Sequence, residues 1–292
     1  MFRILLKTFF HYFWNLHSYV LKRNIYYRNK HKGETCYIFG NGASIKYFDI
    51  TKLPNHITIA TTFSLFDNRM KKIIPNYYVI PDQYNFYSFA PIFSVNQKKY
   101  FPLTYNYLSI LFKKIISNNQ KTIFFISITN YYSYFIRPKN LNFFASSSTK
   151  EENKDKSFDL SRDFNYLDGS LDVMIGIAKY MGFSKAILIG CDYLGEPKVE
   201  GHFYSDETPS FGKPIHDEYF KRIKEISEGI EIMTIFPNNV KSPHFKTFNI
   251  QNFDNIDEKY VNNYDIINSD DLTLMRKAAE KNKVYMKISN EK

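Results

Sequence analysis

Two glycines stand directly after an apolar run in "TCYIFGNGAS" (35–44), where a ligand could approach the backbone. Gly40 and Gly42 lack a Cβ, which gives room at the end of a strand. Asn41 and Ser44 add an amide and a hydroxyl that can form hydrogen bonds. A helix that starts at such a turn points free N–H groups towards an anion. The segment predicts a nucleotide- or phosphate-binding turn, with a plain tight turn as the alternative. It lacks the full G-x-G-x-x-G pattern and is not a Walker loop.

Regular elements must position this turn, and six apolar runs are typical of buried strands. They cover residues 35–40, 56–63, 77–82, 121–128, 185–193 and 230–237. Apolar residues recur at helical spacing over 170–183 and over 217–229. Gly182 and Gly229 are the expected C-caps of these two helices. A further helix is expected near the end of the chain, with Ser269 as its N-cap. Strands that alternate with helices predict an α/β fold with a doubly wound, mostly parallel sheet.

The net charge is concentrated at the beginning of the chain. It is +10, and seven basic residues precede the first acidic residue, Glu34. The remaining 32 basic and 29 acidic residues nearly balance. Nucleic-acid binding would need a basic stripe on the body as well, so we expect none. Cys36 and Cys191 lie in apolar runs and form neither a disulfide framework nor a zinc set, which favours a reducing, cytoplasmic compartment.

The first 32 residues mix aromatic, apolar and basic side chains. Polar residues interrupt the apolar ones too often for a membrane-spanning helix. The segment also lacks a cleavage site of small residues, so we do not expect a signal peptide. The mixture is typical of an amphipathic helix in a membrane interface, with Lys and Arg on anionic headgroups. The expected partner is therefore the inner membrane surface. The alternative is a helix that packs on the domain or forms a homo-oligomer contact.

Residues 146–164, "SSSTKEENKDKSFDLSRDF", break the alternation of strands and helices. They are polar and charged with few large apolar groups. We expect a flexible lid over a site, with a disordered surface insertion as the alternative.

Three blocks of the sequence, in order, resemble one group of proteins. The first is "CYIFGNGASIKYFDITKLPNHITIA" (36–60), the second "GSLDVMIGIAKYMGFSKAILIGCDY" (169–193), and the third "FPNN" (236–239). They resemble the bacterial sialyltransferases with a single Rossmann-like domain, and their MptE-like relatives. The resemblance implies a nucleotide-sugar-binding domain over 33–250, preceded by the helix of residues 1–32 and followed by a C-terminal helical tail over 251–292.

The resemblance also implies nucleotide contacts at particular positions. The first turn would hold the cytidine nucleotide of a CMP-sugar through Gly40, Asn41, Gly42 and Ser44. Other contacts would come from the start of the long helix and from the ends of strands, namely Gly169, Ser170, Asp82, Asp192, and Thr62 or Ser64. The family has an Asn where Thr62 and Ser64 stand, and this departure leaves the exact nucleotide open. Tyr193 and Tyr204 are the candidates for contacts to the leaving phosphate.

An inverting transfer needs a base that takes the proton of the acceptor hydroxyl. The family uses a His before the last core helix, which corresponds to His216 in "GKPIHDEYF". His202 in "EGHFYSD" is a competing candidate, and a third alternative is that neither residue is the base. The resemblance implies no metal ion and no cofactor besides the CMP-sugar substrate. Hydroxyls and helix N-termini would then stabilise the charge of the leaving group.

The expected function is an inverting glycosyltransferase that moves an acidic, sialic-acid-like sugar to a cell-surface glycan or glycolipid such as lipopolysaccharide or capsule. Two alternatives stay open: an MptE-like diphosphokinase that uses ATP and Mg²⁺, and a non-catalytic nucleotide-binding module. The basic, aromatic N-terminus favours the transferase, because lipids commonly carry glycan acceptors.

Overall fold

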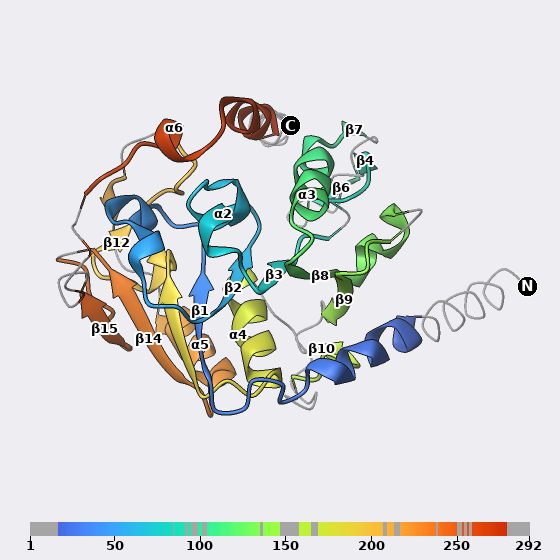
Figure 1. Ribbon diagram of the computed structural model, residues 1–292, viewed down its shortest axis with the longest axis horizontal. Helices are drawn as coiled ribbons and strands as arrows, with labels where there is room; N and C mark the ends of the chain where they lie inside the picture. The colour runs from blue at the N-terminus through green and yellow to red at the C-terminus, as the bar shows by residue number, and fades with distance from the viewer. Residues whose placement is uncertain are drawn as a thin grey trace, which may run out of the picture.

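One sheet of nine strands forms the centre of the protein, and every neighbouring pair in it is parallel (Figure 1). The computed structural model describes residues 17–83, 85–90, 93–94, 99–100, 104–134, 137–146, 158–164, 169–206, 209–212, 217–237, 239–249, 253, 256 and 259–278. The strand order is β10-β9-β8-β3-β2-β1-β11-β14-β15. The strands are β1 (Thr35–Phe39), β2 (Ile57–Thr61), β3 (Tyr77–Ile80), β8 (Ile123–Ser127), β9 (Leu141–Ser146), β10 (Asp163–Phe164), β11 (Lys185–Ile189), β14 (Glu231–Phe236) and β15 (Lys246–Asn249). The doubly wound α/β fold expected from the sequence is confirmed.

The six predicted strands are all present, as β1, β2, β3, β8, β11 and β14. The edge strands β10 and β15, and β9 next to β10, were not predicted. Three two-stranded ribbons lie outside the sheet: β4 (Phe89–Ala90) with β7 (Thr104–Tyr105), β5 (Phe93–Ser94) with β6 (Lys99–Tyr100), and β12 (Lys198–Val199) with β13 (Phe211–Gly212).

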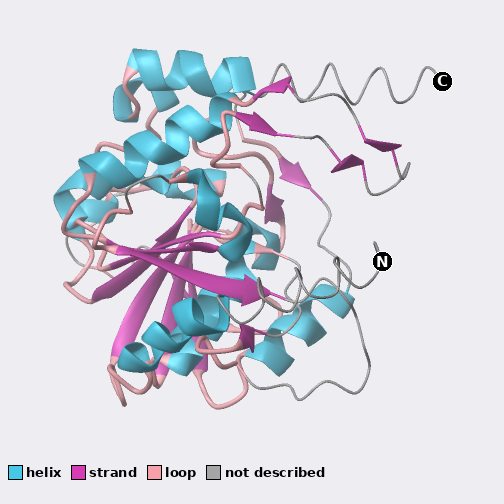
Figure 2. Ribbon diagram, turned by 90° about the vertical axis from the view of Figure 1, so that its right-hand side faces the viewer, coloured by secondary structure: helices cyan, strands magenta, loops and turns pink. Residues whose placement is uncertain are grey.

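Helices cover both faces of the sheet (Figure 2). The long ones are α3 (Tyr107–Asn118), α4 (Ser170–Tyr180) and α5 (Asp217–Ile226). The short ones are η1 (Arg23–Tyr27), η2 (Ala43–Tyr47), η3 (Ile50–Lys52), η4 (Ser64–Phe66), α2 (Met70–Ile73), η5 (Ile128–Ser133), η6 (Asp192–Leu194) and α6 (Asn263–Ile266). Residues 17–22 and 269–278 are also helical.

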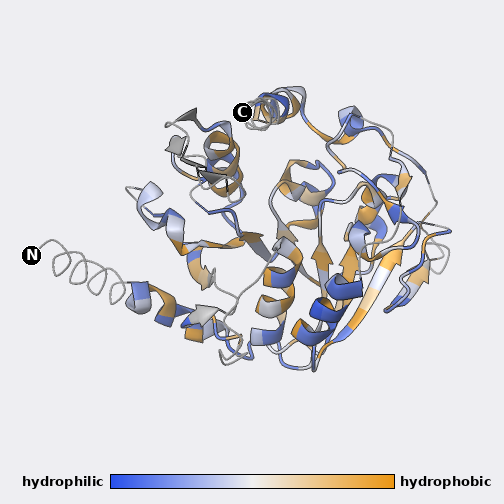
Figure 3. Cartoon of the chain, turned by 180° about the vertical axis from the view of Figure 1, so that it is seen from behind, coloured by the Kyte–Doolittle hydropathy of each residue, from blue (hydrophilic) through white to orange (hydrophobic). Residues whose placement is uncertain are grey.

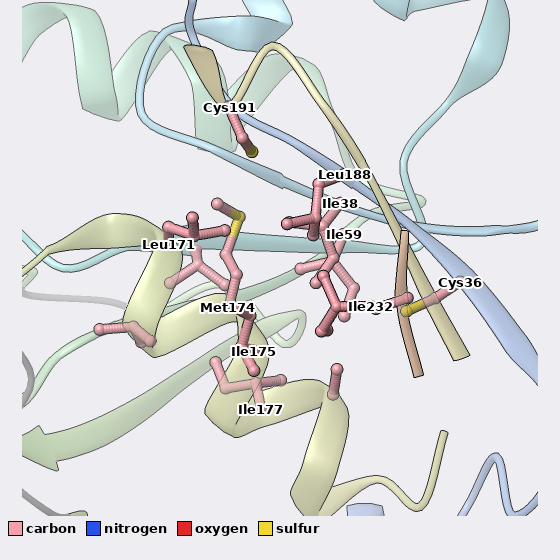
Figure 4. Close-up of a cluster of buried hydrophobic side chains, with 14 of the residues drawn as sticks. Cys36, Ile38, Ile59, Leu171, Met174, Ile175, Ile177, Leu188, Cys191 and Ile232 are labelled. Carbon is pink, nitrogen blue, oxygen red and sulfur yellow. The ribbon is translucent and has the colours of Figure 1, made fainter. Parts of the chain in front are cut away.

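Each face of the sheet has its own apolar core. Alternate strand residues such as Ile38 and Leu188 pack with Met174 and Ile177 of α4 on one face (Figure 4). The intervening residues, such as Phe39, pack under α2, α3 and the C-terminal helix. Figure 3 shows the resulting apolar strands inside a more polar outer layer. This two-sided burial explains why the strands read as continuous apolar runs.

The predicted C-terminal cap of α4 is present, whereas the N-cap of the C-terminal helix lies one residue earlier than predicted. Gly182, with φ +84°, follows α4. Its N–H donates to the Lys179 carbonyl, and the Phe183 N–H donates to the Ala178 carbonyl. These two bonds form a Schellman cap. The C-terminal helix is capped by Asn268, whose side chain accepts from the Asp270 N–H at 2.9 Å, and not by Ser269. The helix begins at Ser269, one residue earlier than predicted, so the residue before it provides the cap.

Both terminal segments pack against the sheet domain where the structure describes them. The buried Asn24 amide donates to the carbonyls of Phe143 and Leu160 at 2.7 and 2.8 Å. At the other end, Leu272 and Met275 of the C-terminal helix are buried in the second core. The chain from residue 17 to residue 278 therefore shares one pair of cores. Residues 1–16 lie outside the described residues.

The segment 146–164, predicted as a flexible lid, is bounded by two parallel strands. Ser146 ends β9, and β10 (Asp163–Phe164) pairs with it in register. Leu160 is fully buried and Ser161 is nearly so. Residues 158–164 thus belong to the domain, because Leu160 fills the core beside the Asn24 amide. Residues 147–157 lie outside the described residues.

Candidate active site

A cavity of about 710 Å³ opens at the carboxyl ends of β1 and β11. These strands pair at the point where the chain order reverses, because β2 lies on one side of β1 and β11 on the other. Loops that leave a parallel sheet at such a point diverge and form a crevice where ligands bind. It is lined by five segments, together with the single residues Thr61 and Met174: Gly40–Gly42, Gly169–Leu171, Gly190–Tyr193, 198–202 and the α5 residues Tyr219 and Arg222.

The glycines of the first turn are required by protein contacts as well as by the cavity. A Cβ on Gly40 would lie 2.4 Å from the Gly190 carbonyl oxygen, and a Cβ on Gly42 would lie 2.3 Å from the Asp192 Cγ. The two turns are also joined by the Gly42 N–H, which donates to the Gly190 carbonyl at 2.8 Å. The room expected for a ligand at these Cβ positions is therefore occupied by the neighbouring turn.

Asp192 anchors the first turn from the end of β11. Its carboxylate accepts from the Ser44 N–H at 2.8 Å and from the Ser44 hydroxyl, so it caps the start of η2. Burial raises the pKa of Asp192 to about 7, although the hydrogen bonds of Ser44 oppose this shift. Ser44 itself is fully buried and does not line the cavity. The pair predicted to bind a nucleotide thus holds the loop in place, with Asp192 alone reaching the cavity wall.

Asn41 is oriented by a residue with an unusual backbone. Its side-chain amide donates to the Thr62 hydroxyl, and its Oδ1 is buried without a hydrogen-bond partner among the described residues. Thr62 has φ +45°, which is costly for a β-branched residue. Strain of this kind persists where the surroundings enforce it, often beside functional sites. The geometry leaves the side-chain Oδ1 of a cavity-lining residue as a buried acceptor without a hydrogen-bond partner among the described residues.

His202 lies against the first turn. It forms an antiparallel bridge with Gly42, and the following Phe203 N–H donates to the Asn41 carbonyl at 3.1 Å. Burial lowers the pKa of His202 below its usual 6.5, against an opposing hydrogen bond to the Asn41 backbone. Its ring stacks on Tyr204 at a centroid distance of 5.0 Å. A neutral imidazole at neutral pH can accept a proton. His216 lies outside the described residues.

The other polar groups of the cavity come from α4, α5 and the β12 ribbon. Gly169 and Ser170 begin α4, whose first turn has no side-chain cap. Lys198 lies 3.2 Å from Glu200. Arg222 lies 3.0 Å from the fully buried Asp172. Tyr193 contributes a half-exposed phenol. Amide, guanidinium, ammonium and hydroxyl donors therefore converge, which suits a phosphate or carboxylate ligand.

Most of the predicted site residues meet in this cavity. Its lining includes Gly40, Asn41, Gly42, Gly169, Ser170, Asp192, Tyr193 and His202. Thr62 and Tyr204 contact the lining residues Asn41 and His202 from outside the cavity. Ser64 lies elsewhere, because its buried hydroxyl donates to the Thr61 carbonyl at 2.8 Å and only supports the backbone after β2.

Asp82 is also absent from the lining. Burial raises the pKa of this carboxyl, and the Asn85 amide donates to it at 3.4 Å. Its position at the end of β3 lies two strands away from β1.

Five lining residues with polar side chains were not predicted: Thr61, Lys198, Glu200, Tyr219 and Arg222. Thr61 ends β2, and the other four reach the cavity because the β12 ribbon packs beside η6 and α5 packs beside α4. One signal was available, since Asp172 stands between Leu171 and Val173 in an otherwise apolar helix and needs a cationic partner. Among the described residues, no group of three or more His, Cys, Asp or Glu could hold a metal ion.

Comparisons with solved structures give likenesses of low sequence identity. The chain is similar to the sialyltransferase CstII from Campylobacter jejuni in complex with CMP, at 16% identity and a TM-score of 0.42 over 85% of this chain and 99% of that one. It is similar to the α-2,3-sialyltransferase Cst-I from the same organism, at 16% identity and a TM-score of 0.38 over 86% and 96%.

The MAf glycosyltransferase from Magnetospirillum magneticum AMB-1 aligns at 11% identity and a TM-score of 0.40, over 90% of this chain and 42% of that one. No protein-family model and no curated protein matches the chain.

Proposed function

We propose that the protein is an inverting glycosyltransferase that moves an acidic, sialic-acid-like sugar from a CMP-sugar to a cell-surface glycan such as lipopolysaccharide or capsule. The observation that carries the proposal is the cavity at the β1–β11 switch point, lined by the Gly-Asn-Gly turn, the start of α4 and His202. Its volume is in the range of sites for small ligands and cofactors.

The charges of the cavity support a donor with few phosphates. The cations of the described lining are Lys198 and Arg222, and each lies beside a carboxylate. A CMP-sugar with an acidic sugar has one phosphodiester and one carboxylate, so two directed cations and the α4 amides would suffice for it.

The proposed reaction is a direct displacement at the anomeric carbon. The acceptor oxygen forms its bond to that carbon while the bond to the phosphate oxygen breaks and CMP leaves. A histidine takes the hydroxyl proton, with His202 in the described cavity and His216 in the segment just before α5 as the two candidates. The Tyr193 hydroxyl and the donors at the start of α4 would stabilise the charge on the leaving phosphate without a metal ion.

The donor is tested by measuring the thermal unfolding of the protein with CMP, CDP, UDP, GDP and ATP, each with and without Mg²⁺. We expect CMP to raise the Tm most, independently of Mg²⁺, because ligands that bind only the folded state stabilise it. Release of CMP from CMP-sialic acid in the presence of a glycan acceptor then tests for transfer. A Mg²⁺-dependent preference for ATP would favour the diphosphokinase, and binding of CMP without turnover of any CMP-sugar would favour the binding module.

We further propose that the protein binds the cytoplasmic face of the inner membrane through residues 17–33. Leu21, Asn24 and Tyr27 are buried against the domain and fix the segment. Tyr19 and Tyr26 point outwards with 72% and 71% of their surface exposed, among the exposed cations Lys22, Arg23, Arg28, Lys30 and Lys32. No acidic residue stands in this segment. Aromatic and basic side chains on one face suit anionic headgroups, at about 1 kcal/mol per cation. None of the described helices has the length and apolarity to cross a bilayer.

The membrane proposal is tested by co-sedimentation with vesicles of phosphatidylcholine, with and without phosphatidylglycerol. The variant Tyr19→Ser/Arg23→Gln/Tyr26→Ser/Lys30→Gln should lose binding to the anionic vesicles. The exposed residues Lys71 and Lys72 lie on α2, so the control variant Lys71→Gln/Lys72→Gln, with the same change of charge, should bind like the wild type. Equal binding by all three proteins would contradict the proposal.

A further inference from the structure

An ion pair joins α4 and α5 at the wall of the cavity. The Arg222 Nε lies 3.0 Å from the Asp172 Oδ2. The Asp172 side chain is fully buried, whereas that of Arg222 keeps 29% of its surface exposed and lines the cavity. The pair therefore has one end inside the protein and one end in the site.

Burial of Asp172 explains why a cation is present but not why that cation is an arginine. A buried carboxylate needs a paired cation, and a lysine on α5 could also provide one. A guanidinium differs because it is planar and has several N–H donors in a fixed fork. Its guanidinium forms an ion pair with Asp172, with Nε 3.0 Å from Oδ2, and its central carbon lies 4.9 Å from the centre of the Tyr219 ring. These two contacts restrain the guanidinium.

The fixed guanidinium lies beside a second set of donors. Gly169, Ser170 and Leu171 line the same cavity, and they form the start of α4 one turn from Asp172. An oxyanion between them could accept hydrogen bonds from the arginine and from backbone amides. Because the ion pair is neutral as a whole, the ligand would be held by directed donors and less by net charge.

We propose that Arg222, oriented by Asp172 and Tyr219, binds an oxyanion of the sugar donor at the start of α4, either its phosphate or the carboxylate of its sugar. This inference rests on the proposed function and adds the residue that selects an anionic donor. Lys198 differs in its partner, because the Glu200 side chain is 45% exposed whereas Asp172 is fully buried.

The test is calorimetric titration of Arg222→Ala, Arg222→Lys and Asp172→Asn with cytidine, CMP and a non-hydrolysable CMP-sialic acid analogue. Arg222→Ala should weaken binding of the analogue by about 10- to 100-fold and leave cytidine unchanged. Arg222→Lys should recover little, because an ammonium cannot form the fork. Asp172→Asn should weaken binding less, since the guanidinium stays but is free to turn. Equal losses for CMP and the analogue identify the phosphate, whereas a loss confined to the analogue identifies the carboxylate.

A matched control separates this role from a purely structural one. Arg69 pairs with the fully buried Asp67 at 2.7 Å and does not line the cavity. Arg69→Ala should lower stability and leave every affinity unchanged. Wild-type affinities in Arg222→Ala, or equal losses in Arg69→Ala, would overturn the inference.

Failure of the proposed function has a different signature. A wild-type protein that binds no cytidine nucleotide would refute that function. Inorganic phosphate then serves as the probe of the arginine: protection from thermal unfolding in the wild type but not in Arg222→Ala supports the oxyanion site, and equal behaviour of the two proteins overturns it.

Discussion

Replacing Gly42 by Ala tests whether the first turn is held by protein packing. The new Cβ would lie 2.3 Å from the Asp192 Cγ and 2.4 and 2.6 Å from its two oxygens. Real Cβ atoms do not approach closer than 3.0 Å, so the carboxyl group must move. Movement weakens the bonds that it accepts from the Ser44 N–H and hydroxyl.

The cost follows from these two effects. Overpacking of a buried site costs about 1–3 kcal/mol, and loss of a hydrogen bond to a charged acceptor costs about 1.5–3 kcal/mol. Because the loop can relax, we expect Gly42→Ala to lower the free energy of unfolding by about 2–5 kcal/mol. Urea unfolding measures this as a lower midpoint at an unchanged slope.

Two further variants isolate the clash. Gly169→Ala is the matched control, because nothing lies within 4 Å of its new Cβ, and it should cost less than about 1 kcal/mol. In Gly42→Ala/Asp192→Ala the clashing group is gone, so the double variant should be more stable than additivity predicts by about 1–3 kcal/mol. An unchanged midpoint in Gly42→Ala, or strict additivity in the cycle, would refute the packing argument and leave ligand approach as the reason for the glycine.

Three other predictions concern the same cavity. Burial raises the pKa of Asp192 to about 7 from 3.8 in the unfolded chain, so its contribution to stability is fully present below about pH 4 and is lost as the pH rises towards 7. Relative to the wild type, Asp192→Asn should therefore gain stability over that range in urea unfolding at a series of pH values, and a constant difference would contradict this. Asn41→Ala should weaken CMP binding by about 1–3 kcal/mol with the fold intact, and an unchanged affinity would remove this side chain from the site. Loss of the catalytic histidine should lower the transfer rate by about 10²–10⁴-fold and abolish the rise of rate with pH. Burial lowers the pKa of His202, so if His202 is the base the midpoint of that rise should lie below the usual pKa of 6.5. Near wild-type turnover by both His202→Ala and His216→Ala would exclude both residues.

The central strands could be predicted from sequence because they are buried on both faces. "AILIGC" (186–191) is apolar throughout, as a strand between two helical layers must be. The strands near the two ends of the sheet have weaker signals. β15 (Lys246–Asn249) has only one apolar residue, Phe248, and β9 (Leu141–Ser146) continues into a serine-rich run, so neither is distinct from a loop.

The candidate site was predictable where it lies next to a strand end. Asn41 and Asp192 each follow an apolar run, and the topology of a doubly wound sheet brings such ends together. Tyr219 and Arg222 were not predictable, because they lie on a polar helix whose rotation is fixed only when Phe220 and Ile223 enter the core. Ser64 lies outside the cavity lining, because a hydroxyl after a strand can bond to its own backbone as readily as to a ligand.

The pairing of β1 with β11 has a consequence for how the chain folds. β1 is the first strand to be synthesised, yet one of its edges pairs with residues 185–189, long after β2, β3, β8 and β9 have emerged. Until then a nascent chain presents the unpaired backbone N–H and C=O groups of β1 at what will become the middle of its sheet. Pairings between distant segments form slowly, and such an edge can associate with other chains in the meantime. The ligand crevice is thus completed late in folding, because both of its walls depend on the same pair of strands.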